Sequence, residues 1–200
     1  MTFSKRLVTI DPMNIPSKQE IIKYLLFEKE SRFQRERYDG IIKPKTPNLS
    51  EAASEALVAH LIKDGDILKE LQPIVTIELL GKNGKDILVN KFHKIEVKGT
   101  SCVEGCVTTS ESNFESFAWV WPDFRPFFHA SNSIINIHVI RNPKVSIRSK
   151  RYVEKLNEYK LSLKNAVNDA IKARNYEYLR FNLKTMLTLE DLSKRWFVNA

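Results

Sequence analysis

Three charged residues near the middle of the chain, two acids and one lysine, form the most interesting local pattern of chemically active side chains. Asp86 begins one predicted strand, and Glu96 and Lys98 stand two residues apart on the next. Carboxylates bind hard divalent cations, and lysine pairs with phosphate. Two structural interpretations compete with a catalytic one. Asp86 follows a predicted turn so closely that it also suits a turn residue, and alternating charge is ordinary on a half-buried strand.

This pattern of an acid at a strand start and Glu-x-Lys on the next strand resembles the catalytic core of the restriction-endonuclease-like nucleases, the PD-(D/E)xK family. The resemblance implies that Asp86 and Glu96 are ligands of a divalent metal, Mg²⁺ or Mn²⁺, which activates water, and that Lys98 orients the nucleophile. It also implies that Glu51 or Glu55, on the preceding helix, supplies a further carboxylate. The implied activity is metal-dependent cleavage of nucleic acid.

The elements that must position these residues are a hairpin and the strand after it. Residues 73–80 and 86–89 have the apolar and β-branched content of strands, and Asn83-Gly84 between them is a typical tight-turn dipeptide. Residues 94–98 predict a third strand. The charged residues therefore belong to a predicted antiparallel sheet.

Two helices are predicted before the hairpin. Ser17 and Glu20 form a capping box, and the apolar residues after them keep helical spacing until Gly40. Ser50 is the expected N-cap of the second helix, which ends at Gly65. This second helix carries the two additional acids.

The order of elements predicts an α+β fold. With 200 residues, of which 42% are hydrophobic, the chain can bury a core without disulfides or metals. We expect N-terminal helices, a central mainly antiparallel sheet that includes strands at 117–121 and 133–140, and a basic C-terminal helical layer. Residues 1–140 are the expected body, and residues 141–200 are the expected helical segment packed on it, in one continuous domain.

The positive charge of the chain lies in its last third. The net charge is +8, and residues 141–200 carry 14 Lys and Arg against 6 Asp and Glu, so they hold the whole excess. Four of the six tyrosines lie among these cations: Tyr152, Tyr159, Tyr176 and Tyr178. Cations interleaved with aromatic residues can contact phosphates while the rings stack on bases. The alternative interpretation is that these cations are an ordinary solvent-exposed face of a basic protein and bind no partner.

The leading functional hypothesis from the sequence is a basic, non-enzymatic protein that binds or assembles on DNA or RNA, as a viral or mobile-element structural or accessory protein would. The predicted phosphate contacts and stacking residues all lie in the C-terminal segment: Arg148, Lys150, Arg151, Tyr152, Lys155, Tyr159, Lys160 and Lys164. The metal-dependent nuclease is the alternative. A matrix-like protein on an anionic membrane surface is a third hypothesis.

Two further features suggest contacts with proteins. Residues 114–128 are rich in aromatic residues and poor in cations, which favours a buried core and leaves open a partner-binding or base-stacking face. Residues 152–173 repeat apolar positions at alternating spacings of four and three, which predicts a helical heptad seam. Such a seam packs against the same chain or against a second copy.

Several classes of site and compartment are disfavoured. The chain has neither the dinucleotide-binding nor the P-loop glycine pattern, so no cofactor is expected apart from Mg²⁺ or Mn²⁺ under the nuclease hypothesis. Cys102 and Cys106 could meet His93, His129 or His138 in a zinc site, but no second cysteine pair exists. Without a recognisable export signal, we expect a reducing, intracellular setting: cytoplasm, nucleus or a virus particle.

Overall fold

The computed structural model describes residues 15–37, 49–80, 86–100, 106–109, 113–123, 126–127, 130–131, 133–144, 146–147 and 159–186. The helices are α1 (Lys18–Arg37), α2 (Glu51–Lys63) and α3 (Leu163–Lys172), with short 3₁₀ helices η2 (Lys69–Leu71) and η3 (Leu183–Met186). The predicted helices after Ser17 and Ser50 are thereby confirmed.

A six-stranded sheet forms the centre of the molecule. Its strands, in the order β1-β2-β3-β5-β8-β11, are β1 (Ile77–Leu79), β2 (Ile87–Val89), β3 (His93–Gly99), β5 (Ser116–Asp123), β8 (Ile134–Arg141) and β11 (Tyr176–Asn182). Every neighbouring pair is antiparallel except β3 and β5, which run parallel. The prediction of an α+β protein with a mainly antiparallel sheet is confirmed.

Two small sheets complete the described strands. One has the order β4-β10-β9, from β4 (Cys106–Thr109), β10 (Tyr159–Ser162) and β9 (Ser146–Ile147). The other pairs β6 (Pro126–Phe127) with β7 (Ala130–Ser131). The molecule therefore contains more strand than the sequence analysis predicts.

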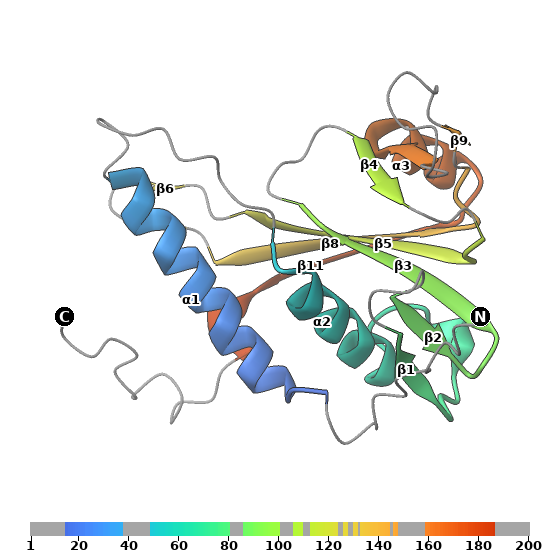
Figure 1. Cartoon of the computed structure of the whole chain (residues 1–200), viewed down its shortest axis with the longest axis horizontal. Coiled ribbons are helices and arrows are strands. Elements are labelled where there is room, and N and C mark those ends of the chain that lie inside the picture. Colours follow the sequence, from blue (N-terminus) through green and yellow to red (C-terminus); the bar gives the residue numbers. More distant parts are fainter. Residues whose placement is uncertain are drawn as a thin grey trace, which may run out of the picture.

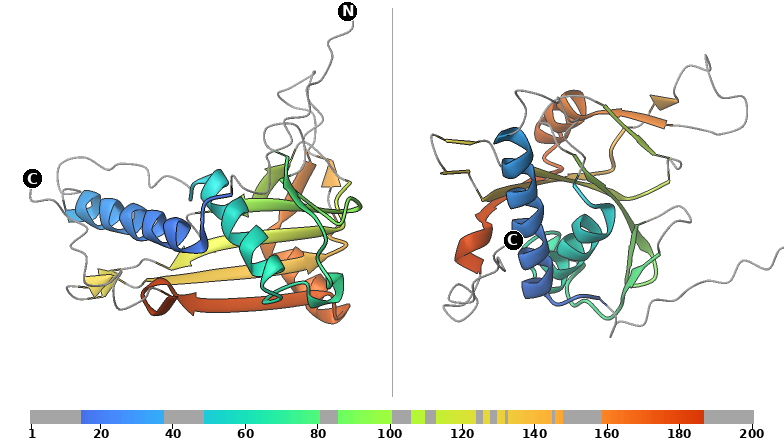
Figure 2. Two further views of the ribbon diagram at one scale, coloured as in Figure 1. Left: turned by 90° about the horizontal axis from the view of Figure 1, so that it is seen from below. Right: turned by 60° about the vertical axis from the view of Figure 1, so that its left-hand side comes forward.

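The large sheet has a separate hydrophobic core on each face. Seen nearly edge-on in Figure 1, it has α1 and α2 on one side and α3 with the β4-β10-β9 sheet on the other, and Figure 2 shows the same order of layers. The α1 and α2 side buries residues such as Leu57, Ile62 and Val97, while the α3 side buries Phe117 and Trp119. Strands β5 and β8 are consequently covered on both faces, as their apolar content requires.

Local capping explains where the first two helices begin. The Ser17 N–H donates to Glu20 Oε2 at 2.8 Å, and the Glu20 N–H donates to Ser17 Oγ at 3.2 Å, which is a reciprocal capping box. Ser50 Oγ accepts a bond from the Ala53 N–H at 3.4 Å. These bonds satisfy backbone donors that have no partner within the helix.

Gly99, at the end of β3, lets α2 pack closely on the sheet. A methyl group added at Gly99 would lie 2.5 Å from Ser54 Oγ and 3.0 Å from the Leu49 carbonyl oxygen. Real side-chain carbons do not tolerate such separations without movement of the neighbour. Glycine at this position therefore sets the distance between β3 and the first turns of α2.

The structure does not show the predicted basic C-terminal helical layer, and in the described part of this segment strands replace much of the expected helix. Within residues 159–186, only Leu163–Lys172 is α-helical, and it is flanked by strands β10 and β11. Strand β11 pairs with β8 along its whole length, from Tyr176 opposite Ile140 to Asn182 opposite Ile134. The predicted seam over 152–173 therefore breaks at β10, because the backbone groups of 159–162 pair with β4 instead of forming helical bonds.

Among the side chains that the structure describes, the aromatic stripe of residues 114–128 is mostly core, which is the interpretation that its composition favours. Phe117 and Trp119 are buried in the core on the α3 side, and Trp121 packs against it while partly exposed. The helix α3 turns Leu163 and Ala166 into this same core. The α3 residues of the predicted heptad seam therefore pack against the sheet of the same chain. Leu163, Ala166 and Ala170 are buried there without a second copy of the protein.

We predict that Gly99→Ala destabilises the protein by about 1–3 kcal/mol, because the added methyl group forces β3 and α2 apart. Chemical denaturation measures this change. In a Ser54→Ala background the cost of Gly99→Ala should be smaller, since the nearest atom is gone. An unchanged denaturation midpoint for Gly99→Ala would contradict the close packing.

Candidate functional site

The candidate site lies along the edge of β3, just beyond the first residue of β2, where the described pairing of the two strands stops and β3 continues. Strand β2 pairs with β3 only from Ile87 opposite Ile95 to Val89 opposite His93. Just beyond that pairing, the Val97 N–H donates to Asp86 Oδ2 at 2.5 Å. The Asp86 carboxylate thus takes the place that a carbonyl of a longer β2 would have filled, and the hydrogen bond fixes its position beside β3.

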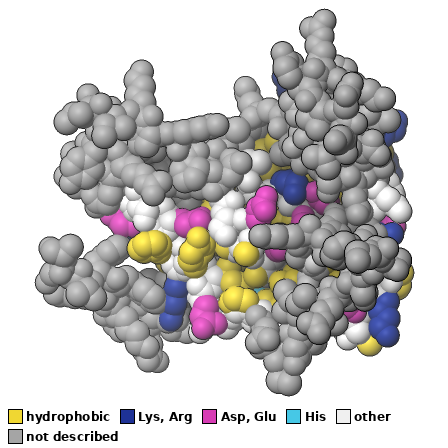
Figure 3. All heavy atoms as spheres, in the orientation of Figure 1, with side chains coloured by type: hydrophobic (Ala, Val, Ile, Leu, Met, Phe, Trp, Pro, Cys, Tyr) yellow, Lys and Arg dark blue, Asp and Glu magenta, His cyan; other side chains and the backbone are white. Residues whose placement is uncertain are grey.

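Asp86, Glu96 and Lys98 come together at this edge. Lys98 Nζ lies 3.0 Å from Glu96 Oε1 and 4.0 Å from Asp86 Oδ2. Glu96 and Lys98 are two residues apart on β3, so their side chains leave the same face of the strand. Figure 3, in the orientation of Figure 1, shows acidic side chains beside a basic one over the region of α2 and β3. The three residues predicted from the sequence form one cluster.

The cluster is mostly shielded from water but still reachable. The side chain of Glu96 is 3% exposed, that of Asp86 is 15% exposed and that of Lys98 is 23% exposed. A buried charge is costly unless it is paired and hydrogen-bonded. One ammonium group close to two carboxylates leaves the cluster short of positive charge.

The excess of negative charge in the cluster affects the pKa of Asp86. Burial, followed by the negative charge of Glu96, raises the pKa of Asp86 to about 7, against the opposing effects of Lys98 and of the Val97 N–H bond. The result is a carboxyl group that is easily protonated near neutral pH. A second cation at this place would relieve the crowding of negative charge.

Lys98 is held in its charged form. Burial acts to lower the pKa of Lys98, but the charges of Glu96 and Asp86 and the hydrogen bond to Glu96 outweigh it and raise the pKa above its ordinary value. The lysine therefore serves as a fixed ammonium group that donates hydrogen bonds and not as a base.

The helix α2 brings further acids toward the cluster. Burial and the neighbouring charge of Glu51 raise the pKa of Glu55, which also responds to the charges of Lys98 and Glu96. Glu55 is partly exposed, and Glu51 is exposed in the first turn of the helix. Of the two acids named from the sequence, Glu55 is the better placed to act with the pair on the strands.

The described residues offer two converging carboxylates and no larger set of ligands. No group of three or more His, Cys, Asp and Glu side chains within these residues is arranged to hold a metal ion. Two carboxylates suit Mg²⁺, which usually keeps several waters and binds one or two protein carboxylates together with substrate phosphates. The donor set therefore fits Mg²⁺ or Mn²⁺ and does not fit a closed structural metal site.

Most of the predicted phosphate contacts fall outside this site. Arg148, Lys150, Arg151, Tyr152 and Lys155 lie outside the described residues. Tyr159 and Lys160 belong to β10. Lys164 is exposed in the first turn of α3, on the other layer from α2.

The histidines considered for zinc have other partners. His93 Nε2 is 2.9 Å from Ser116 Oγ, and His138 Nδ1 is 2.8 Å from Tyr176 Oη. Burial lowers the pKa of His138 to about 4, so its ring is neutral at physiological pH. Cys102 and His129 lie outside the described residues.

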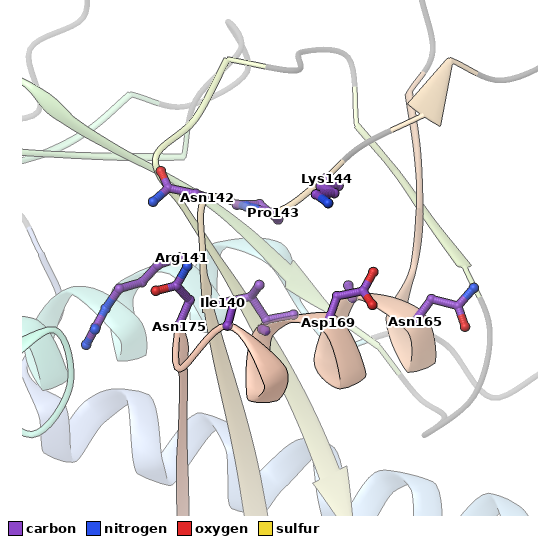
Figure 4. Close-up of a pocket in the computed structure, with 11 residues that line it drawn as sticks. Ile140, Arg141, Asn142, Pro143, Lys144, Asn165, Asp169 and Asn175 are labelled. Carbon is purple, nitrogen blue, oxygen red and sulfur yellow. The ribbon is translucent and has the colours of Figure 1, made fainter.

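A cavity of about 280 Å³ lies elsewhere, between the end of β8 and α3. Figure 4 shows Asn142 and Lys144 on one side of it and Asn165 and Asp169 of α3 on the other. None of the residues of the charged cluster lines it. The cavity is thus separate from the candidate site.

Comparison with protein-family models, with curated proteins and with solved structures found no match. Within the described residues, no helix is both long enough and apolar enough to cross a membrane.

We predict opposite shifts in the pKa of Asp86 for two substitutions. Glu96→Gln removes a negative neighbour and should lower the pKa of Asp86 from about 7, whereas Lys98→Met removes a positive neighbour and should raise it. Carboxyl NMR titration measures both values. If neither substitution moves the titration of Asp86, the three side chains do not share a site.

Proposed function

We propose that this protein is a divalent-metal-dependent nuclease in which Asp86, Glu96 and Lys98 form the catalytic cluster. The observation that carries the proposal is the convergence of the three side chains at one sheet edge, with Lys98 Nζ within 3.0 Å of Glu96 and 4.0 Å of Asp86. If Asp86 were only a turn residue, and Glu96 and Lys98 only the polar face of a half-buried strand, the three side chains would have no reason to converge. Glu96 would also be exposed to solvent. The resemblance to the PD-(D/E)xK nucleases supports the same chemistry.

In this proposal Asp86 and Glu96 hold Mg²⁺ or Mn²⁺, with Glu55 as a further acid close by. The metal, when bound, would supply an activated water and stabilise charge on the phosphate. The Val97 N–H fixes one Asp86 oxygen, so the carboxylate is oriented before a ligand arrives. The low exposure of Glu96 restricts competing water around its oxygens.

Lys98 has the role of a positioned cation. Its ammonium group donates to Glu96, and its remaining N–H groups are available to a water molecule or a phosphate oxygen at the exposed side of the cluster. Because its charged form is favoured, it can stabilise the negative charge that builds up on the phosphate during attack.

The test is cleavage of plasmid DNA and of RNA in the presence of Mg²⁺ or Mn²⁺. Wild-type protein should cut, and Glu96→Gln, Asp86→Asn and Lys98→Met should each reduce the rate at least about 100-fold, since each removes a group that acts on the reacting phosphate. Glu78→Gln is the matched control, because Glu78 is an acid on β1 of the same sheet and outside the cluster.

Cutting that survives Glu96→Gln, or that persists when EDTA removes the metal, would refute the proposal. Folding of each variant is checked by circular dichroism and by thermal denaturation. Loss of activity in a folded Glu96→Gln variant, with an unchanged Glu78→Gln control, is the expected result.

Nucleic-acid binding through the basic C-terminal segment is a second candidate function, compatible with the first. The observation in its favour is the charge of the described part of this segment, which exposes the cations Lys144, Lys164, Lys172, Arg174, Arg180 and Lys184. Asp169 is its only exposed acid within 163–186. The membrane-surface hypothesis and a viral or mobile-element role stay predictions, and flotation with anionic liposomes separates membrane from nucleic-acid binding.

We predict that binding to nucleic acid weakens steeply with salt, and that the double variant Lys164→Ala/Lys172→Ala flattens this dependence. Each lost phosphate contact reduces the slope of log K against log salt concentration by about 0.7–0.9. Fluorescence anisotropy at several salt concentrations measures the slope. A flat dependence in the wild-type protein would exclude an electrostatic nucleic-acid interface.

A further inference from the structure

A row of side chains crosses the sheet from the candidate site to the opposite edge. Lys98 is the register partner of Trp119, Trp119 of His138, and His138 of Tyr178. Residues in register on neighbouring strands point to the same face. One end of the row is therefore a residue of the catalytic cluster, and the other end is on β11, the edge strand.

The rings in this row are held in place by contacts with one another. Trp119 stacks on His138 with ring centroids 4.6 Å apart, and His138 lies 5.0 Å from the ring of Tyr178. The Tyr178 hydroxyl donates to Asn136 Oδ1 at 2.6 Å. The hydroxyl bond and the histidine contact fix the orientation of the Tyr178 ring, so little entropy is lost when a ligand binds to it.

Tyr178 is far more exposed than the tryptophan in the same row. Trp119 is 3% exposed and lies in the core on the α3 side, whereas Tyr178 is 50% exposed. A tyrosine required only for core packing would be covered like its neighbours. The exposed ring is instead a pre-positioned aromatic surface at the edge of the sheet.

A cation stands beside this surface. Arg180 is exposed, lies two residues beyond Tyr178 on β11 and so points to the same face, and is the register partner of Asn136. No residue in the described part of the chain makes a hydrogen bond or ion pair with its guanidinium. An aromatic face next to a free cation is the combination that binds a base and its phosphate.

We propose that Tyr178 and Arg180 bind an unpaired nucleotide strand that leads to or from the catalytic cluster, which deepens the nuclease function and rests on it. Tyr178 stacks on a base and Arg180 contacts a phosphate. Three strand spacings, about 14 Å, separate Lys98 from Tyr178. Because Trp119 between them is buried, the strand passes around this core and needs more than about four stacked nucleotides, the number that would span the direct distance. The strand is unpaired because a base inside a duplex has no free face for the ring.

The test is the affinity of the full-length protein for fluorescein-labelled oligothymidylate, oligouridylate and a duplex of about 20 nucleotides, in EDTA so that no cutting occurs. Tyr178→Ala should weaken binding of single strands about ten-fold, and Tyr178→Phe, which keeps the ring, should stay within about two-fold of wild type. Duplex binding should change little. The DNA and RNA arms show which sugar the surface accepts.

Tyr24→Ala is the matched control, because Tyr24 is a tyrosine with similar exposure, 45%, on α1 in the other layer. It should leave single-strand affinity unchanged. Arg180→Ala is a second variant on an exposed residue, and it should reduce the salt slope for single strands by about 0.7. Equal affinity of wild type, Tyr178→Ala and Arg180→Ala for both single strands would overturn the proposal.

Cleavage is measured separately, so the two proposals fail in different ways. Loss of single-strand affinity in Tyr178→Ala, in a protein that never cuts, supports the binding surface and refutes the nuclease. If cutting depends on Glu96 but Tyr178→Ala and Arg180→Ala leave single-strand affinity unchanged, the nuclease is supported and the binding surface is refuted.

Discussion

The hydrogen bond from the Val97 N–H to Asp86 decides how the charged cluster is built. The described pairing of β2 with β3 stops at Ile87, and the Val97 N–H beyond it donates to the Asp86 carboxylate at 2.5 Å. The bond brings Asp86 beside β3, where Glu96 and Lys98 already share a face. A longer β2 would satisfy the same donor with a carbonyl, and the second carboxylate would be lost.

The packing of α2 against β3 adds negative charge to the cluster of Asp86, Glu96 and Lys98. Gly99 allows α2 to approach β3, and this approach brings Glu55 within electrostatic reach of Glu96 and Lys98. Phe117 and Trp119 are the register partners of Glu96 and Lys98, so the core on the α3 side lies on the same face of the sheet from which Glu96 and Lys98 project. Negative charge held at low exposure, with a single ammonium group nearby, is an arrangement that favours a divalent cation.

The cluster could be predicted from the sequence because its three residues are close in the chain and joined by a hairpin. The C-terminal part could not, since β11 pairs with β8 about 40 residues earlier. The alternation of Tyr176, Tyr178 and Arg180 with Glu177 and Leu179 has the period of a strand, but the spacing of apolar residues before it favours a helix. The parallel pairing of β3 and β5 has no local signal either, and it determines that Lys98, Trp119, His138 and Tyr178 form one row.

The measurement that tests the central claim most directly is anomalous diffraction from crystals of the protein grown with Mn²⁺ and a non-cleavable phosphorothioate oligonucleotide. The account predicts an anomalous peak within about 2.2 Å of carboxylate oxygens of both Asp86 and Glu96. A protein that binds the oligonucleotide with no such peak, or with manganese bound only at other residues, would contradict it.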